Sequence, residues 1–449
     1  MSQIVKISKG ANIRLKGVAE KVLGNVEMPT SFAVKPPNFH GLVPKLVVKV
    51  GDKVKAGSVL FYDKGNEQIK YASPVSGEVT EIIRGEKRRI LEVRLAADKE
   101  VIFEEHQINE LSKLSGEDVK AALMASGLWA FVKQRPYDIV ANPNETPKSI
   151  HITGLDTAPM APDYDFMIHG HDEVFQVGLD AIAKLTSGKV HLNANGNENP
   201  DQAIAGAKNV QVNKVSGPHP AGNVGIQIHH IDPVNKGEAV WTLRAPDVLS
   251  IGKLFTEGKY DVSRVIALAG SKIKNPKYYK VFPGASIMEM FGNEINDGSR
   301  VISGNVLSGE QVNIDGHINF YDYQISAIPE GGNDQMFGWI APGLDKFSLS
   351  RAFFSWLAPN KEYDLNTNVN GEERAFVVSG EYERVFPMDI LPVFLLKSMM
   401  MEDIDAMEGL GVYEVAPEDF ALCEYGCTSK IEAQKVVRKA LDLVKQECS

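Results

Sequence analysis

The chain has 449 residues, of which 43% are hydrophobic and 24% are charged, so we expect a globular protein of about three or four domains. The formal net charge of −10 argues against a nucleic-acid-binding protein, which would need a concentrated basic face. No stretch approaches the roughly 18 apolar residues of a membrane-spanning helix, and the first residues lack the apolar core of a signal peptide. These exclusions favour a soluble cytoplasmic protein or a peripheral subunit of a larger assembly.

The first predicted domain covers residues 1–105 and is built on a β unit at 44–94. Short β-branched runs alternate there with turn signals, and the sequence VGDKV at 50–54 has a counterpart, VSGEV, at 75–79. We expect residues 1–30, with their glycines and prolines, to wrap this unit. The predicted strands are 46–50, 59–62, 69–72, 77–83 and 90–95. The two-half pattern resembles the biotinyl/lipoyl carrier fold, a flattened β sandwich (barrel-sandwich hybrid).

Carriers of that fold hold biotin or lipoate on a lysine at the tip of a hairpin, and Lys64 lies at the corresponding turn, 63–66. The biotinyl signature Met-Lys-Met is absent, and the chain continues for hundreds of residues beyond the β unit. A solvated turn lysine is therefore the simpler interpretation. A stand-alone lipoyl or biotin carrier remains the alternative, and an intact-mass measurement separates the two.

The second predicted domain covers residues 106–258. Ser115 and Asp118 form a capping pattern for a helix that ends at Gly127. From residue 149 onwards strands and helices alternate, which predicts a Rossmann-like α/β layer. The GxGxxG fingerprint is missing after every strand, so nothing marks a dinucleotide site. The predicted strands are 149–153, 189–193, 210–215 and 240–243, and the helices are 173–186, 200–207 and 246–256.

Two further domains complete the predicted α+β multidomain architecture. Residues 259–332 read as a β-grasp (SLBB-like) domain, the type that binds soluble ligands. Its predicted strands are 265–270, 278–281, 282–286, 300–309 and 321–328, with a short helix at 287–291. Residues 333–449 read as a mostly helical C-terminal domain, with helices at 347–357, 392–401 and 430–447.

Several short motifs, taken in order, resemble the A subunit of the bacterial sodium-translocating NADH:quinone oxidoreductase. This family is related to the NADH-oxidising flavoprotein subunit of complex I and to the C subunit of the Rnf complex. Each motif alone is weak, but together they span nearly the whole chain. The motifs are Ser126–Trp129 with Arg135-Pro136, Asp156–Pro159, Gly217–Gly222, Leu268–Gly270, Ile302–Gly309, Phe337–Trp339 with Pro342-Gly343, Phe347–Arg351 and Cys423–Cys427.

The resemblance implies a peripheral subunit on the cytoplasmic face of the bacterial inner membrane. Its partners would be the other subunits of the complex, integral membrane subunits included. The complex passes electrons from NADH through flavins and Fe-S centres to ubiquinone or menaquinone and exports Na+. The isolated chain would not be catalytic, and it would serve assembly and quinone binding.

Departures from the flavoprotein relatives argue against a cofactor in this chain. Those relatives bind FMN and NADH with a loop of the type Gly-Gly-Ala-Gly-Phe-Pro, whose bare backbone lets phosphate approach. The equivalent stretch, Ala125–Pro136, keeps one glycine and adds bulky side chains. An iron–sulfur cluster needs four thiolates, and the chain has three cysteines. We therefore predict no catalytic residue, bound cofactor or metal site, and a flavin-dependent NADH dehydrogenase is disfavoured.

The candidate quinone-binding residues lie in that altered stretch: Trp129, Phe131, Lys133 and Arg135. A quinone head is flat and apolar with two carbonyl acceptors, so aromatic rings and a basic donor would suit it. The alternative is that the rings only fill the space that a flavin occupies in the relatives. A free-standing ligand-binding module based on the β-grasp domain is a further alternative.

Histidines and apolar C-terminal segments add weaker hypotheses. The close pairs His169/His171 and His229/His230 have no recognised zinc spacing. His219 lies in a stiff proline- and glycine-rich loop, which is typical of a turn shaped for a ligand or partner but equally of a structural loop.

The segments 353–356 and 395–401 are rich in Phe, Trp, Leu and Met, and we expect them to dock on a partner protein, with a helical core as the alternative.

Overall fold

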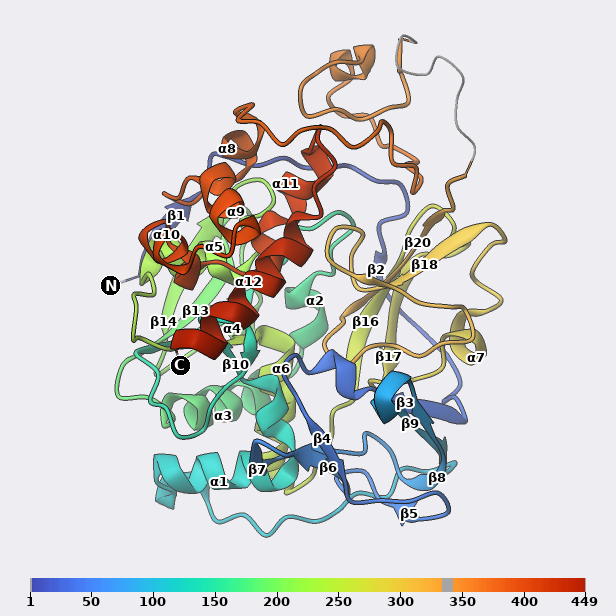
Figure 1. The fold of residues 1–449 in the computed structure, drawn as a ribbon. Helices are drawn as coiled ribbons and strands as arrows, with labels where there is room; N and C mark the ends of the chain where they lie inside the picture. The colour runs from blue at the N-terminus through green and yellow to red at the C-terminus, as the bar shows by residue number, and fades with distance from the viewer. Residues whose placement is uncertain (1, 333–341, 449) are drawn as a thin grey trace.

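The computed structural model describes residues 2–332 and 342–448, and the motif at 337–339 lies outside them. Four sheets are found in the described part of the chain. Figure 1 shows the α/β layer and the β-grasp sheet side by side, with the N-terminal β unit below them and the C-terminal helices over the α/β layer. The predicted fold class is confirmed.

The N-terminal β unit consists of two small sheets, as the carrier-like pattern predicts. The first contains β3 (Ser31–Val34), β9 (Ile90–Ala97), β8 (Gly77–Arg84) and β5 (Lys53–Val54). The second contains β4 (Pro44–Leu46), β6 (Val59–Asp63) and β7 (Asn66–Ala72). Apolar residues from both sheets, among them Phe32, Leu60 and Val93, are fully buried in one core.

The first 30 residues do not wrap this unit as expected. Strand β1 (Ile4–Lys6) pairs in parallel with β14 of the α/β sheet, and β2 (Glu20–Gly24) pairs with β17 of the β-grasp sheet. The reason is burial: Val5 and Ile7 belong to the apolar core beneath the C-terminal helices. The segment therefore ties distant domains together.

The α/β layer is a seven-stranded sheet with the order β1-β14-β13-β12-β15-β10-β11. Strands β12 (Ser149–Gly154), β13 (Lys189–Asn195), β14 (Gln211–Ser216) and β15 (Val240–Arg244) run in parallel. Strand β10 (Lys133–Arg135) pairs antiparallel with β15 and with β11 (Ile139–Val140). The first strand of the parallel set, β12, lies between β13 and β15. The winding direction therefore reverses at the β12/β15 boundary, which is where ligands bind in open α/β sheets.

This domain contains the helices α1 (Gly116–Ser126), α2 (Tyr164–Ile168), α3 (Asp172–Ala183), α4 (Gln202–Ala205), α5 (Val224–Ile231) and α6 (Ala245–Glu257). Helices α3, α5 and α6 pack against strands of the sheet, whereas α1 packs against β7 of the N-terminal β unit. Helix α1 begins and ends as predicted. The Ser115 side chain accepts the N–H of Asp118, whose carboxylate in turn accepts the Ser115 N–H, and Gly127 takes the left-handed conformation at φ 88°.

The β-grasp sheet has the order β19-β18-β20-β16-β17-β2. Its own elements are β16 (Arg264–Ala269), β17 (Lys277–Val281), α7 (Ile287–Phe291), β18 (Ser299–Ser303), β19 (Glu310–Gln311) and β20 (Gln324–Pro329). One predicted strand was wrong, because 282–286 is a loop. The strand predicted at 300–309 is confirmed only in its first part, since the chain leaves the sheet after Ser303. There the Asn305 side chain accepts the N–H groups of Leu307 and Ser308, which closes a turn instead of extending a strand.

The C-terminal domain contains α8 (Glu381–Val385), α9 (Pro392–Met400), α10 (Ile404–Gly409), α11 (Ala421–Gly426) and α12 (Ala433–Cys448), with α12 running across the front in Figure 1. The helix predicted at 347–357 is wrong, because only a 3-10 turn, Phe354–Leu357, forms. Ser348 bonds locally to Ser350 and Ala352, and Arg351 has a φ of 57°. Of the helices described, none has the length and apolar character to cross a membrane.

Short 3-10 turns link these elements, at Pro36–Asn38, Glu86–Arg88, Leu111–Lys113, Leu128–Phe131, Val412–Glu414 and Pro417–Phe420.

Candidate functional site

A cavity of about 90 Å³ lies at the reversal point of the α/β sheet, at the carboxyl ends of β12 and β15. Loops of the β-grasp domain and one segment of the C-terminal domain close it from outside. The lining residues are Phe131, Lys133, Asp138, Thr153, Asp156, Tyr164, His219, Gly222, Asn223, Val224, Thr242, Leu243, Arg244, Asp247, Asn305, Leu307, Ser308, Tyr321, Glu418 and Ala421. Three domains therefore meet at one position where α/β proteins bind ligands.

Two of the four predicted residues reach this cavity. Phe131 packs on Phe320 with ring centroids 4.8 Å apart. Lys133 Nζ lies 2.9 Å from Asp138 Oδ1 and 5.1 Å from the centre of the Tyr321 ring. Although burial opposes it, Lys133 holds the pKa of Asp138 below its usual value. The wall at this point thus combines aromatic surface with a paired cation.

The other two predicted residues lie behind the wall. Trp129 is fully buried, donates its indole N–H to the Ala141 carbonyl at 2.7 Å, and packs edge-on against Trp241. Arg135 is 1% exposed and pairs with Glu418 at 2.8 Å and Asp419 at 3.4 Å. Trp129 therefore fills core space, and Arg135 fastens the C-terminal domain to the sheet.

The position that would hold a phosphate is filled by a carboxylate. In a Rossmann-like layer an anion binds at a helix N-terminus beside the strand ends, and α5 begins at the cavity. A Cβ atom built on Gly225, in the first turn of α5, would lie 2.6 Å from Asp419 Oδ2. Asn223 Nδ2 also donates to Asp419 Oδ1 at 3.4 Å. These residues do not fit a flavin or nucleotide phosphate.

Sequence reasoning missed two charged residues of the site, Asp156 and Arg244. Burial raises the pKa of Asp156, whose carboxylate accepts the Ala158 N–H at 2.9 Å. Arg244 donates to the Tyr321 carbonyl of the β-grasp domain. The available signal was their position, because each stands at or just after the carboxyl end of a parallel strand.

His219 also lines the cavity, so the stiff loop does border the site. His219 is 4% exposed, and burial lowers its pKa to about 4. Its Nδ1 lies 3.2 Å from Thr157 Oγ1. The described residues offer no partner to its Nε2.

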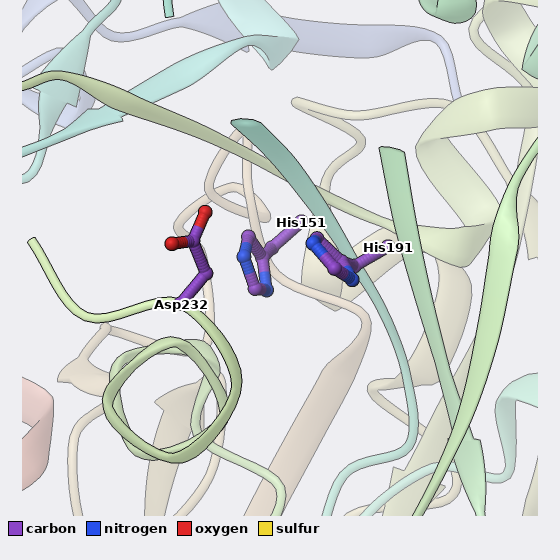
Figure 2. A group of neighbouring side chains, drawn as sticks. All are labelled: His151, His191 and Asp232. Carbon is purple, nitrogen blue, oxygen red and sulfur yellow. The ribbon is translucent and has the colours of Figure 1, made fainter. Parts of the chain in front are cut away.

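A second cluster that the sequence did not reveal combines His151, His191 and Asp232, whose potential ligand atoms lie within 4.8 Å of one another. Figure 2 shows the His151 ring between Asp232 and the His191 ring. The imidazoles stack with centroids 4.5 Å apart, and Lys148 Nζ lies 3.1 Å from Asp232 Oδ1. Asp232 thus already has a cationic partner.

A chain of buried amides beside this cluster fixes its hydrogen-bond directions. Gln227 Nε2 donates to the carbonyls of Ala221 and Gly222 at 3.2 Å, so its Oε1 accepts from Asn193 at 2.9 Å. Asn193 Oδ1 accepts from Asn213 at 3.0 Å. At the far end Asn213 Oδ1 accepts the backbone N–H of Gln3, so backbone groups orient both ends.

This orientation disfavours a metal ion at the two histidines. The amide nitrogens of Asn193 and Asn213 face Nδ1 of His151 and His191 at 3.5 and 3.2 Å. Each Nδ1 must therefore accept, and the neutral rings carry their proton on Nε2. A metal at Nε2 would force the proton onto Nδ1, where it would meet an amide N–H. The donor set does not fit a metal site.

The remaining candidates lie away from the cavity. Lys64 is exposed at the tip between β6 and β7. Cys423 and Cys427 are buried and Cys448 is exposed. Burial raises the pKa of the Cys423 thiol, which disfavours the thiolate that a cluster needs.

The apolar C-terminal segments contain both core and surface residues. Met399 is 3% exposed, whereas Met401 is 79% exposed. Phe394 and Met400 are about half exposed beside Met401, and Phe354, Trp356 and Leu357 form a second exposed group. Docking on a partner stays a prediction, and Met399 belongs to the core.

Three family models match successive parts of the chain. They are the NqrA N-terminal barrel-sandwich hybrid domain over residues 5–98, the NqrA second alpha/beta domain over 114–260, and the NQRA C-terminal domain over 265–313. An NAD+-reducing [NiFe]-hydrogenase in the H2-reduced state has a TM-score of 0.36 at 10% identity, covering 77% of this chain and 66% of that chain. That likeness is too slight to carry a conclusion.

Full-length relatives agree with these matches. The A subunit of the Na(+)-translocating NADH-quinone reductase from Pasteurella multocida (strain Pm70) is 38% identical over 450 residues, covering 99% of this chain and 100% of the relative. Its counterpart from Neisseria meningitidis serogroup A is 38% identical over 449 residues with the same coverage. The resemblance inferred from the motifs is confirmed, and the chain belongs to the family of A subunits of the Na(+)-translocating NADH-quinone reductase.

Proposed function

We propose that this chain is the A subunit of a sodium-translocating NADH–quinone reductase, peripheral on the cytoplasmic face of the membrane and bound to integral membrane subunits. The observation that carries the proposal is the 38% identity over 99% of the chain to relatives that bear this name. This membership favours the reductase subunit over a stand-alone carrier or ligand-binding module.

Isolation from native membranes tests this role. The chain, tagged at its C-terminus, would be extracted in mild detergent, and the co-purifying proteins would be identified and assayed for NADH-dependent quinone reduction with and without Na+. We expect integral membrane redox subunits and sodium-stimulated activity. Recovery of the tagged chain without any membrane redox subunit would contradict the proposal.

In this role the chain holds neither flavin nor an iron–sulfur cluster, and it is not catalytic when isolated. The Asp419 carboxylate at the start of α5 repels a phosphate, and a buried neutral Cys423 is a poor cluster ligand. The flavins and Fe-S centres would then belong to other subunits. Iron analysis and the visible spectrum of the anaerobically purified chain check this, and a flavin or cluster absorbance would contradict it.

The cavity is the position we propose for a quinone ring. A neutral ligand suits it, because the lining cations face nearby carboxylates, as in Lys133 with Asp138. Phe131 and Tyr321 supply aromatic surface, and Lys133 supplies a donor. Trp129 and Arg135 would support this wall from behind without touching the ring.

Binding of ubiquinone-1 to the isolated chain tests the site, with quenching of the buried tryptophans as the signal. Ser308 is exposed and lines the cavity, so Ser308→Trp should obstruct it and weaken binding at least about tenfold. Lys133→Ala should also weaken binding. Ser187→Trp, at the opposite edge of the sheet, is the matched control and should bind normally. Equal binding by both tryptophan variants would place the quinone elsewhere.

A further inference from the structure

His219 is a buried histidine that lines the cavity. The residue is 4% exposed, and nothing among residues 2–332 and 342–448 pairs with its Nε2. A buried polar atom without a partner costs free energy, so it is usually satisfied by a protein group, an ordered water or a ligand. Since His219 lines the cavity, a ligand there can supply the missing partner.

The backbone holds His219 in place from both sides. Its N–H donates to Asn12 Oδ1 at 3.0 Å, and its carbonyl accepts the Ala11 N–H at 2.9 Å. Gly10 approaches this carbonyl so closely that an added Cβ would lie 2.1 Å from the oxygen. The N-terminal segment that joins β1 to β2 therefore fixes the backbone position of His219.

Thr157 determines which ring nitrogen carries the proton. Its Oγ1 accepts the Gly222 N–H at 2.8 Å and lies 3.2 Å from His219 Nδ1. The described residues offer the Thr157 hydroxyl hydrogen no other acceptor, so we infer that it is donated to Nδ1. A neutral imidazole that accepts at Nδ1 carries its proton on Nε2.

We propose that His219 binds the ligand of the cavity by donating a hydrogen bond from Nε2 to a carbonyl oxygen, and that Thr157 is the positioning residue that fixes this tautomer. The inference rests on the proposed quinone site and names the group in it that recognises the ring carbonyl. Burial, which lowers the pKa of His219 to about 4, keeps the imidazole neutral at physiological pH.

The charged groups that line the cavity favour a carbonyl ligand over an anion. The carboxylates of Asp156, Asp247 and Glu418 line the same cavity, so an anionic ligand would be repelled. A divalent metal would need a lone pair at Nε2, which the Thr157 hydrogen bond assigns to Nδ1 instead. A neutral acceptor is left, and a quinone carbonyl is of this class.

Titration of the full-length chain with ubiquinone-1 tests the donor. His219→Leu, which has no donor, should bind about three- to tenfold more weakly than the wild type. His219→Gln, which keeps an N–H donor, should recover part of the loss. Thr157→Val should weaken binding while His219 itself is unchanged. The dimethyl ether analogue of ubiquinone-1, whose ring carbonyls are replaced by methoxy groups, should lose affinity for the wild type and little for His219→Leu.

The tautomer is measured separately by nitrogen NMR of histidine-labelled chain, with His219→Gln to assign the signal. We expect a protonated Nε2 in the wild type and mixed tautomers in Thr157→Val, which gives a readout even if His219→Leu does not fold. Normal ubiquinone-1 binding by a folded His219→Leu chain, or a proton on Nδ1, would overturn the inference without contradicting the proposed quinone site. A wild-type chain that binds no ubiquinone-1 would overturn both.

Discussion

Arg135 of β10 and Asp419 of the C-terminal domain form an ion pair in the interior, with the guanidinium Nη1 atom 3.4 Å from Oδ2 and side chains 1% and 0% exposed. The same carboxylate closes the N-terminus of α5. One buried contact thus joins the altered loop, the α/β sheet and the C-terminal domain at the edge of the cavity. Burial raises the pKa of Asp419 to about 6, with Arg135 opposing the rise.

Removal of the Arg135 guanidinium should destabilise the folded chain. Arg135→Met leaves Asp419 buried without its partner, which we expect to lower the free energy of unfolding by about 3–5 kcal/mol. Urea denaturation followed by circular dichroism measures the loss. Arg384→Met is the control, because its pair with Glu381 is solvent-exposed and worth less than about 1 kcal/mol. Adding Asp419→Leu to Arg135→Met should restore part of the stability, and a further loss would argue against an isolated charge as the cause.

A substitution at Trp129 tests whether this side chain fills the protein core or lines a quinone-binding slot. Because its ring is fully buried and its N–H is bonded to Ala141, Trp129→Ala should cost about 3–5 kcal/mol. Trp356→Ala is the matched control at a side chain that is 48% exposed, and it should leave the thermal midpoint nearly unchanged. A Trp129→Ala chain of normal stability that had lost quinone binding would instead make Trp129 part of the binding surface.

Substitutions at Met401 and Met399 test whether the segment 395–401 docks on a partner protein or packs in the core of this chain. Met401→Glu changes a residue that is 79% exposed, so the isolated chain should melt normally while less of it stays with the membrane complex. Met399→Glu places a charge in the core and should lower the melting temperature strongly. Full retention of the Met401→Glu chain by the complex would exclude this patch as a docking surface.

His219 should contribute a defined pH dependence to stability. Its pKa is about 4 in the folded chain and about 6.5 when unfolded, so the unfolded chain binds more protons between these values. The free energy of unfolding should therefore fall as the pH falls from about 6.5 to 4, by up to about 3 kcal/mol from this group. His219→Gln should remove that component. Parallel stability profiles for the two chains would mean that His219 titrates freely.

The comparison with His219→Gln is needed because buried carboxyls act in the opposite direction. Burial raises the pKa of Asp165 and of Asp419 to about 6, so their protonation stabilises the folded chain as the pH falls below that value. Only the difference between the wild-type and variant profiles isolates the histidine.

Local sequence patterns were sufficient to predict most helices and strands near the cavity. The capping pair Ser115 and Asp118 defined α1, and alternation of apolar strands and helices defined the sheet from β12 to β15. The same reasoning failed at 347–357, where apolar spacing suggested a helix but Ser348 bonds to its neighbours instead. Competition between side-chain and backbone hydrogen bonds is a local effect that spacing alone does not reveal.

Only part of the candidate site could be predicted from the sequence. Phe131 and Lys133 were found because one altered loop contained them. His219 in its loop, Arg244 at the end of β15 and Glu418 in a 3-10 turn come from separate parts of the chain that only folding brings together. Likewise, no pattern in the first 30 residues predicted that β1 and β2 pair with two different sheets, because strand pairing depends on residues far away in the sequence.

The most direct test of the central claim is the sodium-stimulated NADH–quinone reductase activity of membranes from a strain that lacks the gene for this chain. We predict that deletion abolishes this activity, and that expression of the wild-type chain from a plasmid restores both the activity and the sodium stimulation. Membranes without the chain that still reduce quinone with NADH at the wild-type rate, and with the same response to Na+, would contradict the account.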